Sequence, residues 1–204
     1  CQYHVCHVST KESVELVRQA QVQGLRASCE TAPHYLLPCD EDLQEEGRFK
    51  VNPPLRSRAD REALLAGVLD GTIEVVATDH APHTDEEKSR GLAGSAMGIV
   101  GIETAFPLLY TGLVRRGLLP LERLIDLMST NPRRIFGLAG GVEPGQAADF
   151  TVLDLGTRWT IDPAAFLSKG HATPFAGWEV EGCAVLTVVG GRAVYDTLTT
   201  KSIR

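Results

Sequence analysis

The sequence lacks the features that mark membrane, secreted and nucleic-acid-binding proteins. No apolar run is long enough to span a bilayer, and the opening Cys1-Gln2-Tyr3-His4 has neither the basic nor the apolar region of a signal peptide. The 20 Lys and Arg residues are outnumbered by 26 Asp and Glu. A net charge of −6 argues against nucleic acid or anionic membranes as partners, since both require basic patches.

Cysteine is also scarce, with five scattered residues and no Cys-x-x-Cys pair. An odd number of isolated cysteines indicates reduced thiols rather than a disulfide framework or a zinc ribbon, so we expect a cytoplasmic protein. The 43% apolar and 23% charged residues are typical of a globular protein. A chain of 204 residues can bury a substantial core in one or two domains.

Two regions of different texture follow one another along the chain. As far as about Gly140, short apolar runs alternate with helical segments, which predicts an α/β architecture of parallel strands and crossover helices. Beyond it, Gly-rich turns and β-branched runs predict a small β unit, so we divide the chain at 1–139 and 140–204. The predicted strands are 3–8, 25–29, 73–78, 149–154, 184–189 and 192–196, and the predicted helices are 10–23, 59–70, 101–116 and 121–129.

The segment 73–83 carries the clearest chemical signal. An apolar, β-branched run delivers Asp79, His80 and His83 into a turn broken by proline. Polar residues just past the C-terminal end of a parallel strand face the active site in barrel enzymes, and carboxylates with imidazoles suit a zinc-like ion. Asp79 is suited to bind a metal and to take a proton from metal-bound water. The alternative is that Asp79 caps a turn and the histidines lie at the surface.

Three other polar residues follow strands or break loops. His7 ends the first predicted strand and is expected to point into the barrel mouth, as a metal ligand or a structural residue, while His4 should face the other side of the pleat. His34 fits a ligand or a packed residue that orients its loop, and we favour the packed role. Asn52, before two prolines, is suited to hydrogen bond a planar amide or ureide, unless it only caps the next helix.

The stretch 84–98 is first charged and then rich in Gly and Ala. It predicts either a mobile lid, whose Gly98 backbone reaches a ligand, or a disordered surface loop. His83 stands four residues past Asp79 and beyond a proline, so we expect it to face the ligand rather than an ion. We expect His80 to support the site from behind.

With these clusters in this order, the chain resembles a dihydroorotase of the longer, bacterial-type class within the amidohydrolase superfamily. Each motif is weak alone, but their ordered series is strong and runs through nearly the whole chain. The resemblance implies the last three strands of a metal-dependent (β/α)8 TIM barrel followed by part of a small β-sandwich. The motifs are 4–10, 30–34, 50–56, 79–83, 98–104, Asn131-Pro132, 145–149 and Thr173-Pro174-Phe175.

The same resemblance implies an activity and the residues that carry it. The implied reaction is the zinc-dependent, reversible cyclisation of N-carbamoyl-L-aspartate to dihydroorotate in pyrimidine biosynthesis. His7 and Asp79 would be ligands of one or two zinc ions, and Asp79 would be the catalytic acid and base. Asn52, His83 and the Met97–Gly98 backbone would contact this small-molecule substrate. The partners it suggests are a second copy in a homodimer or aspartate transcarbamoylase.

The family's His-x-His-x-Arg strand, its bridging carboxylate and a further metal-binding histidine have no match in this chain. Three strands of eight cannot close a barrel, so we expect unpaired sheet edges and exposed apolar faces. Two protein ligands are fewer than the three that a catalytic zinc normally has. We therefore expect the chain to be an incomplete dihydroorotase, inactive by itself or completed by another chain or by further sequence.

Two rival functions stay open. One is another cyclic amidohydrolase, such as a dihydropyrimidinase or an allantoinase, although Asn52 before two prolines separates the chain from allantoinase-like relatives. The other is a non-catalytic, dihydroorotase-like scaffold that binds aspartate transcarbamoylase. The presence of His7, Asp79 and His83 argues against such degeneration.

Overall fold

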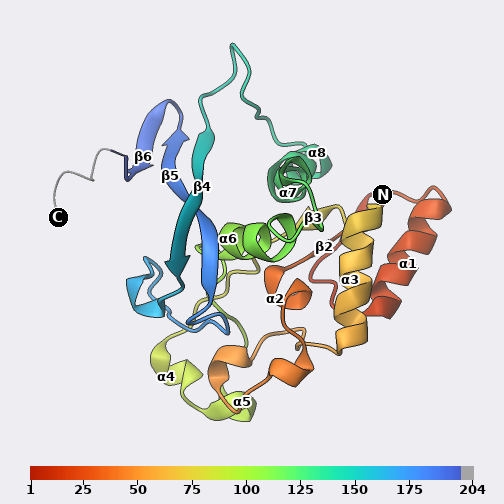
Figure 1. Cartoon of the computed structure of the whole chain (residues 1–204). Coiled ribbons are helices and arrows are strands. Elements are labelled where there is room, and N and C mark those ends of the chain that lie inside the picture. Colours follow the sequence, from red (N-terminus) through yellow and green to blue (C-terminus); the bar gives the residue numbers. More distant parts are fainter. Residues whose placement is uncertain (199–204) are drawn as a thin grey trace.

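The computed structural model describes residues 1–198 and contains two sheets with helices between and outside them. Figure 1 shows the antiparallel sheet on the left, helix α6 (Ala105–Leu109) in the middle, and the parallel sheet behind helices α1 (Lys11–Val22) and α3 (Arg58–Asp70) on the right. The strand–helix–strand order confirms the predicted α/β architecture. Among the described residues, no helix has the length and apolar character needed to cross a bilayer.

The parallel sheet has the strand order β1-β2-β3, so that β1 and β3 form its edges. The strands are β1 (Tyr3–Val5), β2 (Ala27–Thr31) and β3 (Val75–Val76). Both strand pairs are parallel, as predicted. The first and third strands are shorter than the predicted 3–8 and 73–78, because a strand extends only as far as its neighbour pairs with it.

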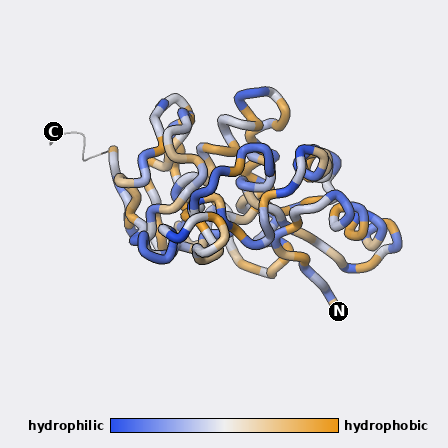
Figure 2. Tube along the Cα trace, turned by 90° about the horizontal axis from the view of Figure 1, so that it is seen from below, coloured by the Kyte–Doolittle hydropathy of each residue, from blue (hydrophilic) through white to orange (hydrophobic). Residues whose placement is uncertain are grey.

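Local sequence signals set the bounds of the two outer helices. The Thr10 hydroxyl accepts a hydrogen bond from the Ser13 amide at 3.2 Å and so caps the start of α1. Ser57 caps α3 in the same way, and Gly71 ends α3 with a φ of 92°. The helices face the core through buried apolar side chains such as Leu64. Figure 2 shows hydrophobic and hydrophilic residues alternating along these outer helices.

Two helical stretches connect the parallel sheet to the antiparallel sheet, and both contain π-helical turns. The first is α6 followed by η3 (Tyr110–Val114), and the second is α7 (Leu121–Ile125), η4 (Asp126–Thr130) and α8 (Asn131–Phe136). The helix predicted at 121–129 therefore ends too early, because the helical stretch continues to Phe136. Pro132 directly follows the π-helical turn η4, in the first turn of α8.

Shorter helices fill the loops around the sheet ends. They are α2 (Pro33–Leu36), η1 (Asp40–Asp42), η2 (Gly47–Phe49), α4 (Asp85–Lys88), α5 (Gly91–Gly94) and η5 (Pro163–Ala165). The stretch predicted as a lid or a disordered loop is thus built around two of these helices. A capping box between Thr84 and Glu87 fixes the start of α4.

The antiparallel sheet has the order β4-β5-β6. Its strands are β4 (Phe150–Thr160), β5 (Glu179–Val189) and β6 (Arg192–Asp196). The last matches the predicted strand, while the other two extend further because bulges let the pairing continue past irregular positions. Strand β5 packs closely on α6 and η3: a Cβ at Gly182 would lie 3.1 Å from the Phe106 ring and 3.2 Å from Tyr110.

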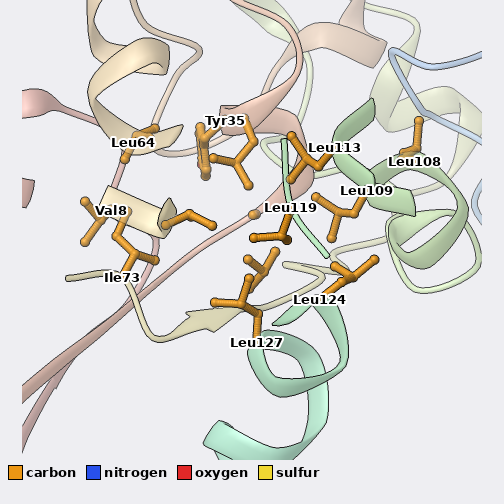
Figure 3. Packing of buried hydrophobic residues seen from close by; sticks show 14 of the residues in the cluster. Val8, Tyr35, Leu64, Ile73, Leu108, Leu109, Leu113, Leu119, Leu124 and Leu127 are labelled. Atoms are coloured by element: carbon orange, nitrogen blue, oxygen red, sulfur yellow. The ribbon is translucent and has the colours of Figure 1, made fainter. Parts of the chain in front are cut away.

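One buried cluster connects the two sheets. It contains Val8 and Leu64 beside the parallel sheet and Ile161, Phe175 and Val180 beside the antiparallel sheet. Figure 3 shows its central part, where Tyr35 lies between Leu64 on one side and leucines from α6 and η3 on the other. The division at 1–139 and 140–204 stays a prediction.

The surface carries large apolar side chains that nothing in the described chain covers. Ile102 is 62% exposed, Phe136 is 54% exposed and Val142 is 86% exposed. Apolar exposure of this kind was expected for a part of a barrel. All five cysteines are free thiols, as their spacing predicted.

Candidate active site

His7 and Asp79 lie just past the ends of β1 and β3 and share an unusual backbone conformation. Their φ angles are 55° and 47°, and no other non-glycine residue in the described part of the chain has a positive φ. Left-handed backbone at residues with a side chain costs about 1–3 kcal/mol each and is concentrated at functional sites. The two residues that were predicted from the sequence as metal ligands are thus the two non-glycine residues with a strained backbone conformation.

The Asp79 carboxylate lies between two imidazoles. Its Oδ1 is 3.8 Å from His7 Nε2, and its Oδ2 is 3.3 Å from His34 Nε2. His34, on α2, is 1% exposed and packs against the Tyr35 ring at 4.2 Å between centroids. Burial lowers the pKa of His34, although the Asp79 carboxylate partly opposes this shift. A neutral imidazole therefore faces one oxygen of Asp79.

Glu30, at the end of β2, belongs to the same cluster and was not among the predicted site residues. Its Oε1 lies 3.4 Å from His7 Nδ1, and its Oε2 lies 3.2 Å from His4 Nε2. The other ring nitrogen of His4 is 2.8 Å from Ser28 Oγ. Ser28 and Glu30 alternate along β2 and so share a face, a sequence signal that could have indicated Glu30 but was not used.

His4 was expected on the opposite side of the pleat from His7, and that expectation is wrong. Both histidines contact Glu30. Strand β1 ends at Val5 and the left-handed His7 turns the chain, so the two-residue alternation of a strand does not extend to residue 7. Glu30 can therefore orient the His7 ring from behind, as carboxylates do for metal-binding histidines.

The residues at this site fit a metal ion. Three buried side-chain nitrogen or oxygen atoms of the described residues make no well-aligned hydrogen bond, and two of them are His7 Nδ1 and His34 Nε2, although each lies within 3.4 Å of a carboxylate oxygen. Unsatisfied buried polar atoms are rare in folded proteins and mark places that a ligand completes. A second donor group, His4, Cys6 and Glu30, has ligand atoms within 4.8 Å of one another. Imidazole, carboxylate and thiol are all donors that zinc accepts.

The residues predicted to contact substrate lie on neighbouring segments. His83 Nε2 is 3.0 Å from the Met97 carbonyl oxygen, and the Gly98 amide donates to the Lys50 carbonyl at 2.9 Å. Asn52, two residues beyond Lys50, is exposed and precedes a cis peptide bond. Met97 is 53% exposed, whereas Gly98 is buried.

Two packing contacts hold these segments to the cluster formed by His7, Glu30, His34 and Asp79. The Tyr35 hydroxyl donates to the Pro53 carbonyl at 2.8 Å, which ties the Asn52 segment to the helix that carries His34. A Cβ at Gly98, where φ is 138°, would lie 2.5 Å from the Ala81 carbonyl oxygen. Only glycine permits this close approach of two backbones.

His80 supports the site through the backbone. Its Nδ1 accepts hydrogen bonds from the Gly101 amide at 3.2 Å and the Ile102 amide at 3.3 Å. The Ala81 amide donates to the Ile99 carbonyl at 2.9 Å. The ring therefore holds the strand end beside the segment that leads into α6.

Parallel strands whose carboxyl ends present imidazoles and carboxylates define the chain as part of a barrel hydrolase of the metal-dependent class. The family model described as the amidohydrolase family matches residues 1–194, and the chain belongs to this family. Membership implies a metal cofactor.

Among individual relatives, two dihydroorotases have high sequence identity to this chain. The chain is 54% identical over 198 residues to a dihydroorotase of Geobacillus sp. (strain WCH70), covering 96% of this chain and 46% of the relative. It is 54% identical over 199 residues to a dihydroorotase of Brevibacillus brevis, covering 96% of this chain and 47% of the relative. The chain spans about half the length of the curated relatives it matches.

Solved structures agree with the fold. An L-hydantoinase (dihydropyrimidinase) from Arthrobacter aurescens is similar with a TM-score of 0.87 and 34% identity, over 96% of this chain and 45% of that one. A dihydropyrimidinase from Brevibacillus agri is similar with a TM-score of 0.88 and 25% identity over the same shares. The match to under half of each neighbour confirms the predicted fold class, a partial barrel of the hydrolase type.

Proposed function

We propose that this chain is the C-terminal part of a dihydroorotase, which interconverts N-carbamoyl-L-aspartate and dihydroorotate in pyrimidine biosynthesis with the help of zinc. One observation carries the proposal. The 54% identity to a dihydroorotase extends over 198 residues, a length that includes the strand ends on which His7 and Asp79 converge at 3.8 Å.

The chain's own residues would divide the chemistry as follows. His7 and Asp79 would hold one or two zinc ions, with Glu30 orienting the His7 ring. A bound zinc would supply Lewis acidity at the ring amide and lower the pKa of water. The two oxygens of Asp79 face different neighbours, so one is available to the metal while the other receives a proton and returns it to the leaving nitrogen.

Substrate binding would fall to the neighbouring segments. Asn52 and His83 would hydrogen bond the planar amide of the ring, and the Met97–Gly98 backbone would lie against it. The contacts between His83 and Met97 and between Gly98 and Lys50 support this assignment, because they hold the segments together without substrate. A homodimer or aspartate transcarbamoylase as partner, and a cytoplasmic location, remain predictions.

A dihydropyrimidinase activity is the second candidate, and the 34% identity to the L-hydantoinase favours it. Dihydroorotate carries a ring carboxylate and dihydrouracil does not, so the two substrates separate the candidates. Turnover of dihydrouracil with no turnover of dihydroorotate would select the second candidate. Absence of bound zinc from the complete gene product would instead favour a non-catalytic scaffold.

The activity is tested on the complete product of the gene that encodes this chain, by cyclisation of N-carbamoyl-L-aspartate with added zinc. We expect Asp79→Asn to lower kcat by roughly 10³-fold, because the proton acceptor is lost, while Asp40→Asn at an exposed site leaves kcat unchanged. Residues 1–204 alone should be inactive, since His7 and Asp79 are two protein ligands where zinc needs three. Rapid turnover by residues 1–204, or full activity of Asp79→Asn, would refute this proposal.

A further inference from the structure

Lys88, the last residue of α4, is a buried lysine whose ammonium makes three hydrogen bonds to backbone carbonyls. Lys88 is 8% exposed and forms no salt bridge within residues 1–198. Its Nζ donates to the Gly98 carbonyl at 2.7 Å, the Ala96 carbonyl at 2.8 Å and the Lys50 carbonyl at 3.1 Å. All three N–H donors of the ammonium are therefore used.

The three acceptors belong to the two segments that are proposed to hold the substrate. Gly98 is itself a proposed contact, and Lys50 stands two residues before Asn52. The Lys50 carbonyl also accepts from the Gly98 amide at 2.9 Å, so the ammonium lies where the two segments cross. Figure 1 shows the segment with α4 and α5 running beside the one around residue 50 at the bottom of the molecule.

Helix α4 cannot move away from these carbonyls without disturbing its surroundings. A Cβ at Gly47 would lie 2.1 Å from the Lys88 carbonyl oxygen, so η2 and the end of α4 are in direct backbone contact. The Ala96 amide donates to the Glu87 carbonyl at 3.0 Å and closes the loop onto the helix. The backbone of Lys88, from which the ammonium extends, is thus held in a fixed position.

A buried ammonium without an acidic partner is costly. Burial, reinforced by the charge of Lys50, lowers the pKa of Lys88 to about 8. An apolar side chain would fill the same space at less cost but would leave three buried carbonyls without a donor. The arrangement favours a role in which one group with three donors holds three backbone carbonyls together.

We propose that Lys88 is a positioning residue, whose ammonium sets the Met97–Gly98 backbone and the Asn52 segment at the spacing in which they bind the ring of the substrate. This inference rests on the proposed function for its meaning in catalysis. Lys88 does not touch the reacting atoms, so its loss weakens substrate binding more than it slows the chemical step.

The test compares Lys88→Met, Lys88→Gln and the exposed-site control Lys11→Met in the complete gene product. For dihydroorotate we expect Lys88→Met to raise KM roughly tenfold or more, which corresponds to about 1.4 kcal/mol, while kcat changes less than about threefold. Lys88→Gln keeps two donors and should give a smaller rise in KM. Lys11→Met should match the wild type.

Amide hydrogen exchange gives a readout that needs no activity. We expect the Gly98 amide to exchange roughly tenfold faster in Lys88→Met than in Lys11→Met, because its acceptor carbonyl is no longer fixed. If Lys88→Met does not fold, Lys88→Gln is judged by the same two measurements.

The outcomes separate the two proposals. A wild type that turns over no dihydroorotate contradicts the proposed function, and unchanged exchange of the Gly98 amide then overturns the role of Lys88 as well. An active wild type with folded Lys88→Met whose KM stays within twofold overturns the role of Lys88 alone.

Discussion

At the scale of single residues, the site is defined by side chains on strained backbone. His7 and Asp79 hold left-handed conformations that cost about 1–3 kcal/mol each, and the surrounding structure must enforce them. Their positions follow from the sequence, because each comes just after a run of strand-forming residues. Their conformation does not, because it depends on where the next helix or turn packs.

Lys88 gives the fold a measurable pH dependence. Burial first, and then the charge of Lys50, lowers its pKa from 10.5 to about 8. Between pH 8 and 10.5 the folded chain has released this proton and the unfolded chain still holds it, so the free energy of unfolding rises with pH in that window. We expect the unfolding free energy of the wild type, minus that of Lys88→Met, to become more positive by at most about 3 kcal/mol from pH 7.5 to 10.5.

Urea unfolding at a series of pH values measures this difference. Other titrating groups are common to both proteins and cancel. A wild-type-minus-variant difference that stays flat, or that becomes more negative as the pH rises, would contradict the proposed environment of the Lys88 ammonium.

At the scale of elements, the outer helices depend on the core more than on their own propensity. Leu64 on α3 is 1% exposed, whereas Leu69 on the same helix is 49% exposed. We expect Leu64→Ala to lower the free energy of unfolding by about 2–5 kcal/mol and Leu69→Ala by about 0.5 kcal/mol. Urea denaturation measures both, and equal effects of the two substitutions would show that α3 does not pack as described.

The accuracy of the sequence predictions differs between element types. The helix predicted at 10–23 is observed at Lys11–Val22, because its cap and apolar spacing are local signals. Strand β3 shrinks from the predicted 73–78 to Val75–Val76, because strand pairing depends on a distant partner. The π-helical turns in η3 and η4 have no local signature and were not predicted.

At the scale of the whole molecule, the two sheets share one buried cluster and should unfold together. Both tryptophans, Trp159 and Trp178, lie in or beside the antiparallel sheet, while helices α1–α8 precede it. We expect tryptophan fluorescence and far-ultraviolet circular dichroism to report the same urea midpoint. Leu64→Ala, though distant from that sheet, should lower both midpoints equally.

Two separate transitions would show that residues 1–139 and 140–204 are independent folding units. In that case Leu64→Ala would shift the circular dichroism transition and leave the fluorescence transition in place. The matched Leu69→Ala variant should leave both midpoints near those of the wild type.

The sequence by itself determined the α/β order, the helix caps, the free thiols and the placing of His7 and Asp79 at strand ends. These features depend on neighbours within a few residues, where periodicity and capping act. Only the tertiary structure decided that Glu30 lies between His4 and His7, and that Lys88 joins Gly98 to Lys50. Such contacts join residues far apart in the chain, and they form only when packing brings separate strand ends and loops to one place.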